Sequence, residues 1–217
     1  MAGSRGGGAC VLLVDDHPIV RAGMATLIES TGAVEACVGA DSPDEAMERM
    51  PALQPDLVIV DIQFPDANGL DLVRRLNEGY PAVGVLVVSM HDEMLYAARA
   101  LSHGARGYVM KHEAVHVLED AVLRVLDGGI WLSERMAQHM ASREADGLAT
   151  PIEQLSDREL EVFMLIGQGL ATKEIAAKTE CSVKTIETYR ARIKRKLGLQ
   201  TAAELMHYAV SYQRPSH

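Results

Sequence analysis

Four short apolar segments of the chain each end in a polar residue that can bind a phosphoryl group or a metal ion. The segments are residues 10–14, 57–60, 85–88 and 108–110, and the polar residues that follow them are Asp15, Asp16, Asp61, Ser89 and Lys111. Segments of helical pattern separate these runs, which predicts a parallel sheet with helices on both faces. The carboxyl ends of such strands share one edge. We therefore expect three carboxylates, a hydroxyl and an ammonium group to meet in one crevice.

The N-terminal part of the chain is predicted to hold five β-α units in about 125 residues, a usual domain size. The expected strands end near residues 14, 39, 60, 88 and 110, and the expected helices occupy residues 18–30, 43–50, 70–78, 92–102 and 113–126. The second helix is expected to end before Pro51, because a proline interrupts helical hydrogen bonding. A loop rich in turn formers at residues 64–69 is expected to close over the crevice.

The charge of the chain is unevenly distributed, which indicates two domains with different partners. The formal net charge is −9, but residues 1–146 hold 11 Lys and Arg against 22 Asp and Glu, whereas residues 147–217 hold 10 against 8. The mildly basic part is the candidate for nucleic-acid binding. We expect a flexible tail at residues 1–8, a first domain at 9–127, a linker at 128–151 with a short helix at 134–141, and a second domain at 152–217.

Cysteine usage and hydropathy indicate in which cellular compartment the protein is expected. Cys10, Cys37 and Cys181 are widely spaced, which is typical of reduced cytosolic thiols rather than a disulfide framework, and no metal-binding spacing links them. The longest apolar stretches are far shorter than the ~20 residues needed to cross a bilayer. We therefore expect a cytoplasmic protein with no membrane partner.

The second domain carries helix signals only. The pairs Ser156/Glu159 and Thr201/Glu204 match capping boxes, in which a hydroxyl and a carboxylate each satisfy an N–H of the first turn. Thr172 and Ser182 are expected to be the N-caps of two further helices. Four helices should thus begin near residues 157, 173, 183 and 202.

The acidic crevice has the groups that phosphoryl transfer needs. Three neighbouring carboxylates repel each other by a few kcal/mol per pair at an effective dielectric near ~20, and a hard cation with oxygen ligands, for which Mg²⁺ is the natural candidate, removes that cost. With Asp15 and Asp16 neutralised by the cation, Asp61 can act as a nucleophile and form an aspartyl-phosphate. The Lys111 ammonium and the Ser89 hydroxyl would then position and neutralise the transferred group.

Residues 9 to about 130 resemble the receiver domain of bacterial two-component response regulators. The matching pieces are residues 14–17 (Val-Asp-Asp-His), Asp61 and its loop with Pro65 and Gly69, Ser89, and residues 107–111 (Gly-Tyr-Val-Met-Lys). The resemblance implies a (βα)5 flavodoxin-like doubly wound parallel sheet. It also implies that Asp61 is the phosphoacceptor and a metal ligand, together with Asp15, Asp16 and the backbone carbonyl of Gln63. Ser89 and Lys111 would bind the phosphoryl group, and Ser89 and Tyr108 would be the switch residues.

The chain departs from the common receiver pattern at two places. Gln63-Phe64 precedes Pro65, where many members have methionine next to the proline, and a bulky Met90 follows Ser89. Both departures leave the acceptor intact and bear on the lifetime of the phosphate.

Residues 112–116 (His-Glu-Ala-Val-His) match a metalloprotease pattern, in which two imidazoles on one helix face bind zinc. The pattern begins directly after a strand that ends in Lys111, and a third ligand would have to come from His139 or Glu134. We therefore expect two solvated histidines on an exposed helix rather than a zinc site.

The segment at residues 182–197 combines a basic cluster with an amphipathic pattern. Val183, Ile186, Tyr189, Ile193 and Leu197 recur at helical spacing, so Lys184, Glu187, Thr188, Ala191, Arg192 and Arg195 face outward together. The short helix at residues 173–178 and the turn at residues 179–181 precede it. This arrangement predicts a helix-turn-helix, whose second helix enters the major groove of DNA.

The second domain closely resembles the LuxR-type DNA-binding domain over residues 152–212. The matching pieces are residues 155–159, 173–176, 182–189 and 196–198, with Tyr189 where histidine is frequent. Together with the receiver, this domain makes the chain similar to NarL/FixJ-type response regulators. The resemblance implies that Glu187, Thr188 and Ala191 approach base edges, that Lys184, Arg192, Lys194 and Arg195 are phosphate contacts, and that Thr185 belongs to the same surface.

The last helix has two open interpretations. Leu205, Met206, Ala209 and Tyr212 lie on overlapping apolar faces at residues 202–212. The helix can pack against its own domain, or it can pair two copies of the chain, as this helix commonly does in the family. A dimer would bind two half-sites and gain affinity through effective concentration.

These expectations combine into a DNA-binding response regulator, phosphorylated on Asp61 by a sensor histidine kinase, that acts as a homodimer on double-stranded DNA and does not turn over a substrate. One alternative is a DNA-binding regulator whose degenerate receiver no longer needs phosphate. A less favoured alternative is an aspartate-dependent phosphatase, because such enzymes need a second acid two residues after the nucleophile, where this chain has Gln63. Binding to RNA is disfavoured by the recognition-helix pattern.

Overall fold

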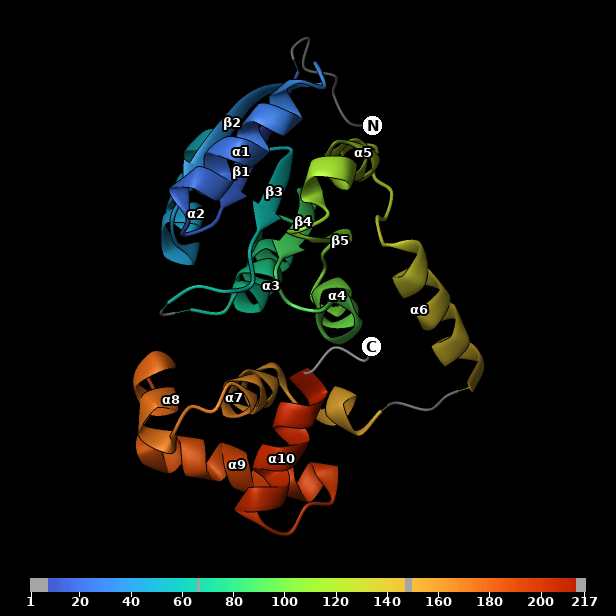
Figure 1. Ribbon diagram of the computed structural model, residues 1–217. Coiled ribbons are helices and arrows are strands. Elements are labelled where there is room, and N and C mark those ends of the chain that lie inside the picture. Colours follow the sequence, from blue (N-terminus) through green and yellow to red (C-terminus); the bar gives the residue numbers. More distant parts are fainter. Residues whose placement is uncertain (1–7, 66, 147–149, 214–217) are drawn as a thin grey trace. The chain divides into compact units, whose positions relative to one another are not determined.

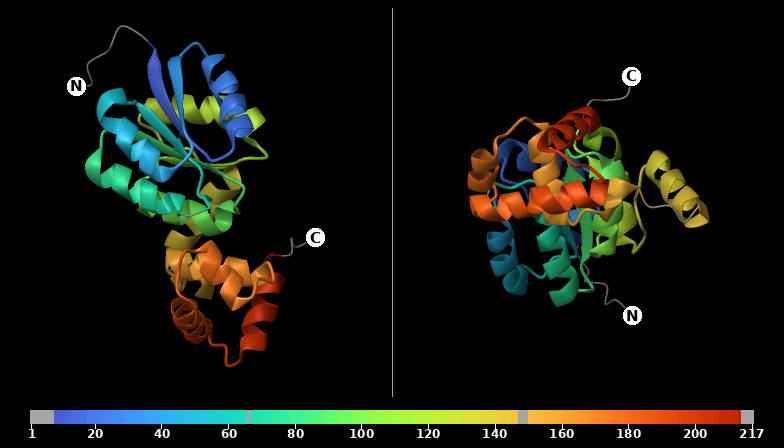
Figure 2. Two further views of the ribbon diagram at one scale, coloured as in Figure 1. Left: turned by 90° about the vertical axis from the view of Figure 1, so that its left-hand side faces the viewer. Right: turned by 90° about the horizontal axis from the view of Figure 1, so that it is seen from below.

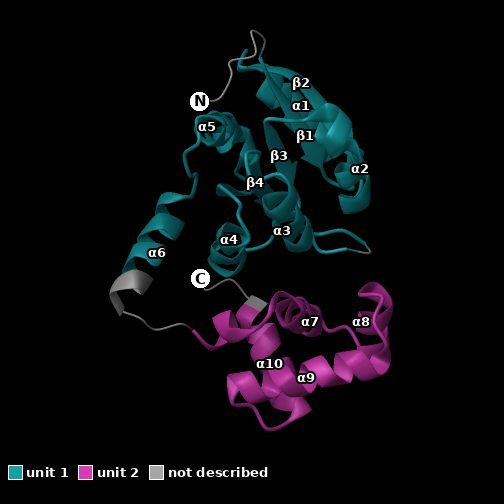
Figure 3. Cartoon of the chain, turned by 180° about the vertical axis from the view of Figure 1, so that it is seen from behind, with its two compact units in different colours: residues 1–144 teal, residues 145–217 magenta. Residues whose placement is uncertain are grey.

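The computed structural model describes residues 8–65, 67–146 and 150–213 (Figure 1). The chain divides into two compact units, residues 1–144 and residues 145–217 (Figure 3). Most of the tail expected at residues 1–8, Asp66 of the expected loop and residues 147–149 of the expected linker lie outside the described residues.

The first unit is built on a parallel sheet of five strands in the order β2-β1-β3-β4-β5, so the predicted doubly wound α/β fold is confirmed. The strands are β1 (Ala9–Val14), β2 (Val34–Ala40), β3 (Leu57–Val60), β4 (Gly84–Ser89) and β5 (Gly107–Met110). Every residue of β3 and β4 is buried, as expected for inner strands covered on both faces. Val14 pairs with Val60, and Val60 pairs with Val87, so the three inner strands end at nearly the same level.

Five helices cover the two faces of this sheet (Figures 1 and 2). They are α1 (Pro18–Glu29), α2 (Pro43–Leu53), α3 (Gly69–Gly79), α4 (Glu93–Ser102) and α5 (Ala114–Leu126). One core forms where α1 and α5 pack on the sheet, with Ile28 and Leu118 against Leu13 and Ile59. The helices α2, α3 and α4 pack side by side on the other face. Alternate residues of each strand supply the two cores, because successive side chains point to opposite faces.

The end of α2 differs from its prediction. Helix α2 was expected to end before Pro51, but it continues through Pro51 to Leu53 and ends where Gln54 adopts a left-handed φ of 46°. Pro51 lies in the last turn, so it removes a single helical hydrogen bond, and Met50 beside it is completely buried. Burial of the Met50 side chain outweighs the local cost of the proline.

The segment after α5 pairs with the edge of the sheet. Gly107 and Trp131 form a parallel bridge, in which the Trp131 N–H donates to the Arg106 carbonyl at 2.9 Å and the Tyr108 N–H donates to the Trp131 carbonyl at 3.1 Å. Helix α6 (Glu134–Asp146) follows and is longer than the helix expected at residues 134–141. The beginning of the expected linker is thus hydrogen-bonded to the first unit.

The described residues of the second unit, 145–146 and 150–213, form helices and loops and include no strand. This unit contains a short 3-10 helix η1 (Pro151–Gln154) and the helices α7 (Asp157–Gly167), α8 (Thr172–Lys178), α9 (Val183–Leu197) and α10 (Ala202–Gln213). Leu160, Phe163, Ile186, Ile193 and Leu205 are fully buried. Helix α7 packs against both α9 and α10, which places it at the centre of this unit.

The helix ends of the second unit largely follow the predicted capping. Ser156 and Glu159 form a capping box on α7, and Thr201 and Glu204 exchange the corresponding hydrogen bonds on α10. The Ser182 hydroxyl accepts the Thr185 N–H at 3.0 Å and caps α9. The prediction for Thr172 is wrong, because Thr172 is the first residue of α8. Its N-cap is Ala171, whose N–H donates to the Glu174 carboxylate at 2.6 Å.

Among the described residues, no helix combines the length and the apolar character that a bilayer span requires.

Candidate functional site

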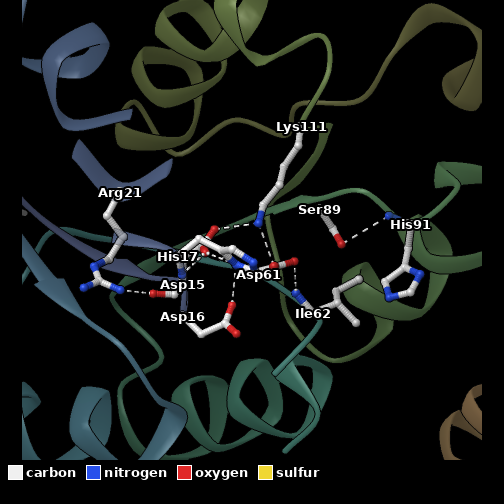
Figure 4. A network of polar contacts seen from close by, with 9 residues as sticks. All are labelled: Asp15, Asp16, His17, Arg21, Asp61, Ile62, Ser89, His91 and Lys111. Carbon is white, nitrogen blue, oxygen red and sulfur yellow. Dashed lines mark hydrogen bonds and ion pairs between the residues drawn. The ribbon is translucent and has the colours of Figure 1, made fainter. Parts of the chain in front are cut away.

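The strand ends bring the predicted polar residues of the first unit together (Figure 4). Asp15 and Asp61 directly follow the neighbouring strands β1 and β3, and the Asp61 N–H donates to the Val14 carbonyl at 2.9 Å. Ser89 ends β4 and accepts the Lys111 N–H on its carbonyl at 2.8 Å, so β5 delivers Lys111 to the same edge. The sheet register therefore places the carboxylates, the hydroxyl and the ammonium in one crevice, as the sequence predicts.

The Lys111 ammonium lies between two buried carboxylates. Its Nζ is 2.6 Å from Asp15 Oδ2 and 2.7 Å from Asp61 Oδ2, and the side chains of Lys111, Asp15 and Asp61 are 11%, 0% and 5% exposed. Burial alone would lower the pKa of Lys111, but contacts with the two carboxylates outweigh it, so the pKa lies above its ordinary value. The ammonium thus stays charged at neutral pH.

Each carboxylate oxygen of Asp61 has a hydrogen-bond donor. Its Oδ1 accepts the Ile62 N–H at 2.7 Å, while Oδ2 faces Lys111. The loop after β3 returns at Gly69, whose N–H donates to the Ile62 carbonyl at 2.8 Å. A Cβ at Gly69 would lie 2.0 Å from the Asp61 carbonyl oxygen, so only glycine allows this close approach. Gln63, two residues beyond Asp61, is exposed and forms an isolated bridge with Asn68.

The acidic pair after β1 has oxygens that suit a hard cation. Asp15 Oδ2 and Asp16 Oδ1 are buried, and each has a basic group at 2.6 Å, Lys111 Nζ and His17 Nδ1 respectively. Buried carboxylate oxygens need positively charged partners, and oxygen ligands are what Mg²⁺ takes in proteins. These donors therefore fit the cation that the receiver resemblance implies.

Two basic residues near this pair were not anticipated. His17 Nδ1 lies 2.6 Å from Asp16 Oδ1 and 3.3 Å from Asp15 Oδ1, and its imidazole makes no capping bond to α1. The Arg21 guanidinium donates through Nη1 to the Asp15 carbonyl. A spacing signal existed, because both residues follow the acidic pair closely in sequence, but their side-chain directions could not be derived from it.

Tyr108 and Ser89 both contact the loop that leads into α4. Tyr108 is 1% exposed, and its hydroxyl donates to the His91 carbonyl at 2.7 Å. The buried Ser89 hydroxyl accepts the His91 N–H at 3.3 Å. Burial raises the pKa of Tyr108 well above its ordinary value, so the phenol stays protonated and remains a donor. His91 stacks on Tyr96 with ring centroids 4.7 Å apart, and burial lowers the pKa of its imidazole.

The expected solvated histidines of the zinc-like pattern are found, but only one lies on a helix. His112 and Glu113 precede α5, which begins at Ala114, so His112 and His116 do not share a helix face. Both histidines are exposed. The described residues contain one group able to hold a metal ion by the closeness of its ligand atoms, and this group is Asp15, Asp16 and His17.

Helix α9 presents the predicted DNA-contacting residues unevenly. Lys184, Glu187, Thr188, Ala191, Arg192 and Arg195 are exposed, whereas Thr185 and Lys194 are partly buried. The Thr185 hydroxyl lies 2.8 Å from the Ser182 hydroxyl, and Lys194 Nζ donates to the Gln200 carbonyl at 3.4 Å. Thr185 and Lys194 thus also stabilise the two ends of α9.

One basic residue of α9, Lys196, forms an ion pair inside the second unit. Lys196 Nζ lies 2.5 Å from Glu159 Oε2 and donates to the Gln154 carbonyl at 2.9 Å, which ties α9 to η1 and α7. Glu159 is 3% exposed. Burial would raise the pKa of Glu159, but the contacts with Lys196 and the Ser156 N–H lower it below its ordinary value.

Helix α10 supports part of each interpretation of its apolar face. Leu205 and Ala209 are completely buried within the unit, and Phe163 of α7 lies with its ring centroid 6.0 Å from those of Tyr208 and Tyr212. Met206 and Tyr212 remain 38% and 41% exposed. Leu205 and Ala209 therefore pack internally, while Met206 and Tyr212 leave part of their apolar surface exposed.

Comparison with known proteins assigns a protein family to each of the two units. The response regulator receiver domain family matches residues 11–123, and the family of bacterial regulatory proteins of the luxR type matches residues 153–209. The transcriptional activator protein ExaE of Pseudomonas putida is 34% identical over 92% of this chain and 95% of its own length. The oxygen regulatory protein NreC of Staphylococcus carnosus is 31% identical over 92% of this chain and 96% of its own length.

A solved structure extends the comparison to three dimensions. RcsB from Salmonella enterica serovar Typhimurium, bound to the promoter P1flhDC in the presence of the phosphomimetic BeF3−, is 25% identical with a TM-score of 0.69. The match covers 94% of this chain and 99% of that one. The chain therefore belongs to the NarL/FixJ-type response regulators, which join a receiver domain to a LuxR-type DNA-binding domain.

Proposed function

We propose that this protein is phosphorylated on Asp61 by a sensor histidine kinase and thereby controls its binding to double-stranded DNA. The observation that carries the proposal is the crevice in which the Asp61 carboxylate, 5% exposed, lies 2.7 Å from the Lys111 ammonium and beside the Asp15 and Asp16 acids. An acceptor carboxylate, a fixed cation and oxygen donors for Mg²⁺ are the parts that phosphoryl transfer requires.

The transfer exchanges one bond for another. An Asp61 carboxylate oxygen attacks the phosphorus of a phosphohistidine, an O–P bond forms as the P–N bond breaks, and the released imidazole nitrogen takes up a proton. Lys111 stays protonated because of its raised pKa and neutralises the phosphoryl oxygens. Asp15, Asp16, Asp61 and the Gln63 carbonyl would hold Mg²⁺, which when bound would supply positive charge to neutralise the transferred group.

The Ser89 hydroxyl is the switch donor in this proposal. It lies at the end of β4, and its oxygen accepts a long 3.3 Å hydrogen bond from the His91 N–H. A phosphoryl oxygen on Asp61 would offer this hydroxyl a charged acceptor, which forms a stronger hydrogen bond. The loop at His91 would follow, and Tyr108, which donates to the same loop, would change position with it.

The output of the switch would be DNA binding by α9. Exposed Glu187, Thr188 and Ala191 would approach base edges, and Lys184, Arg192, Lys194 and Arg195 would contact phosphates, with Thr185 on the same face. Met206 and Tyr212 of α10 offer apolar surface for a second copy, so that a homodimer binds two half-sites. The site of action would be the cytoplasm, where a kinase and DNA are both available.

The test is acid-labile labelling of Asp61. Incubation with acetyl phosphate and Mg²⁺ should add one phosphoryl group to the wild-type chain, detected by intact mass, and Asp61→Asn should abolish it. Asp44→Asn is the matched control, because Asp44 is an exposed residue of α2 that pairs with Arg75 at 2.9 Å. Labelling of the Asp61→Asn variant at the wild-type level would overturn the proposal.

The same variant separates the proposal from its rivals. Footprints on a selected duplex are recorded with and without the phosphodonor. The phosphodonor should change the footprint of the wild type and leave that of Asp61→Asn unchanged. Identical footprints would favour a regulator that does not need phosphate. Steady turnover of a phosphate monoester would instead favour a phosphatase, although the exposed Gln63 offers no second acid.

A further inference from the structure

We propose that Arg21 is a positioning residue for the cation site. Its guanidinium holds the Asp15 peptide, and this contact fixes the orientation of the Asp15 and Asp16 carboxylates. Gly39 leaves space for the guanidinium. This inference rests on the proposed metal-dependent phosphorylation of Asp61 and adds a residue to its machinery. Arg21 touches neither Asp61 nor Lys111 through any described hydrogen bond or ion pair, so it would act through the acidic pair.

The contact is made at the backbone between the two acids. Arg21 lies in the first turn of α1, and its Nη1 donates to the Asp15 carbonyl, as Figure 4 shows. The Asp15 N–H donates to the Ala40 carbonyl at 3.2 Å, and the Asp15 carboxylate accepts the His17 N–H at 2.8 Å. Both backbone groups of Asp15 and its Oδ1 are therefore occupied, and Oδ2 lies 2.6 Å from Lys111 Nζ.

Gly39 supplies the space that the guanidinium needs. A Cβ built on Gly39 would lie 3.1 Å from Arg21 Nε and 3.4 Å from Arg21 Cδ. Gly39 pairs with Leu13 in the register of β1 and β2, two residues before Asp15. A larger residue at position 39 would push the arginine away from the Asp15 carbonyl without changing any charge.

Positioning and charge predict effects of opposite sign. Arg21 is a permanent cation, so its positive charge alone opposes the binding of a second cation nearby. If Arg21 only contributed charge, its removal would tighten Mg²⁺ binding. If it holds the Asp15–Asp16 peptide, its removal weakens Mg²⁺ binding, because groups that orient metal ligands affect affinity strongly.

The experiment compares Mg²⁺ affinities of the full chain by isothermal titration calorimetry. Arg21→Gln should weaken binding about tenfold, the range for residues that orient metal ligands, and Gly39→Val should weaken it in the same direction. The double variant should bind as the weaker single variant does, because both changes break one contact. Arg21→Lys, which keeps a donor and the charge, should recover part of the affinity. Arg74→Gln on α3 is the control, since Arg74 is exposed and pairs with exposed Glu78.

A spectroscopic readout accompanies the affinities. The Asp16 amide resonance reports on the peptide whose carbonyl Arg21 binds, and it should shift in both Arg21→Gln and Gly39→Val in the absence of metal. Gly39→Ala, which displaces the guanidinium less, replaces Gly39→Val if the larger residue prevents folding. Unchanged or tighter Mg²⁺ binding by Arg21→Gln, or fully additive losses in the double variant, would overturn the inference. Failure of the wild type to bind Mg²⁺ would instead refute the proposed function.

Discussion

Replacement of Lys111 by methionine tests whether the Lys111 ammonium compensates the negative charges of the Asp15 and Asp61 carboxylates, as the structure indicates. Methionine keeps most of the volume and flexibility of the side chain but removes the ammonium. Asp15 and Asp61, 0% and 5% exposed, would then face each other without the cation that lies 2.6 and 2.7 Å from them. Two buried like charges remain, and this is the condition that a bound divalent cation relieves.

The size of the effect follows from the two contacts. At an effective dielectric of about 20, each contact of about 2.7 Å contributes roughly 6 kcal/mol of Coulomb attraction before desolvation is subtracted. Desolvation cancels most of this, and breaking a buried pair by removing one partner costs about 3–5 kcal/mol. We therefore expect the free energy of unfolding of the first unit, without metal, to fall by about 3–5 kcal/mol.

The single tryptophan of the chain provides the assay. Trp131 bridges Gly107 of β5 and packs on the core of the first unit, so its fluorescence during urea unfolding reports on that unit. Arg74→Met is the control, because the Arg74–Glu78 pair at 3.0 Å is exposed and should contribute less than about 1 kcal/mol. Mg²⁺ stabilises by mass action, about 2.7 kcal/mol at one hundred times its Kd.

Magnesium should therefore restore the Lys111→Met variant more than it stabilises the wild type. The ammonium occupies the carboxylate oxygens that the cation uses, so its removal should tighten Mg²⁺ binding, and each tenfold change adds about 1.4 kcal/mol. A loss below about 1 kcal/mol without metal, the range of an exposed pair, would contradict the buried-pair reasoning. An equal response of both proteins to Mg²⁺ would show that ammonium and cation do not compete for the same oxygens.

Three further outcomes are expected. Arg192→Ala should weaken DNA binding evenly across sequences and lower the slope of log affinity against log salt by about one, measured by fluorescence anisotropy; an unchanged slope would exclude a phosphate contact. Lys196→Met should destabilise the second unit by about 1.5–3 kcal/mol at neutral pH. Because the pKa of Glu159 is lowered in the folded state, the Glu159–Lys196 contact adds stability at pH values above 4.5, and this stability is lost as the pH falls through the pKa of the folded state. The free energy of unfolding of the variant, followed by circular dichroism, should therefore depend less steeply on pH in acid. Tyr108→Phe removes the hydrogen bond to the His91 carbonyl and should cost about 0.5–1.5 kcal/mol in the urea assay, and no cost would mean that water replaces it.

The convergence of the site was predictable because it depends on topology alone. Asp15, Asp61, Ser89 and Lys111 end or follow strands, and parallel strands joined by helices must end at one edge. The capping residues Ser156 and Ser182 were predictable for a similar reason, since a cap satisfies N–H groups two or three residues away. These inferences need only the order and spacing of residues.

Two features that the sequence pattern did not show arise from packing. Pro51 was expected to end α2, yet the burial of Met50 holds the last turn around it. Trp131 lies in the predicted linker, and the open edge of β5 supplies backbone partners that the sequence pattern did not indicate. In both places a tertiary neighbour outweighs a local preference that is correct for an isolated segment.

The sequence by itself determined which strands form, which polar residues reach the crevice and which side of α9 is exposed. The reason is that hydrophobic periodicity and strand polarity act over short spans of chain. Only the tertiary structure decided how those groups are supported: Arg21 on the Asp15 carbonyl, the space above Gly39, and Lys196 bound to Glu159. The reason is the reach of long side chains, whose charged ends can take many positions until packed neighbours leave one with a partner.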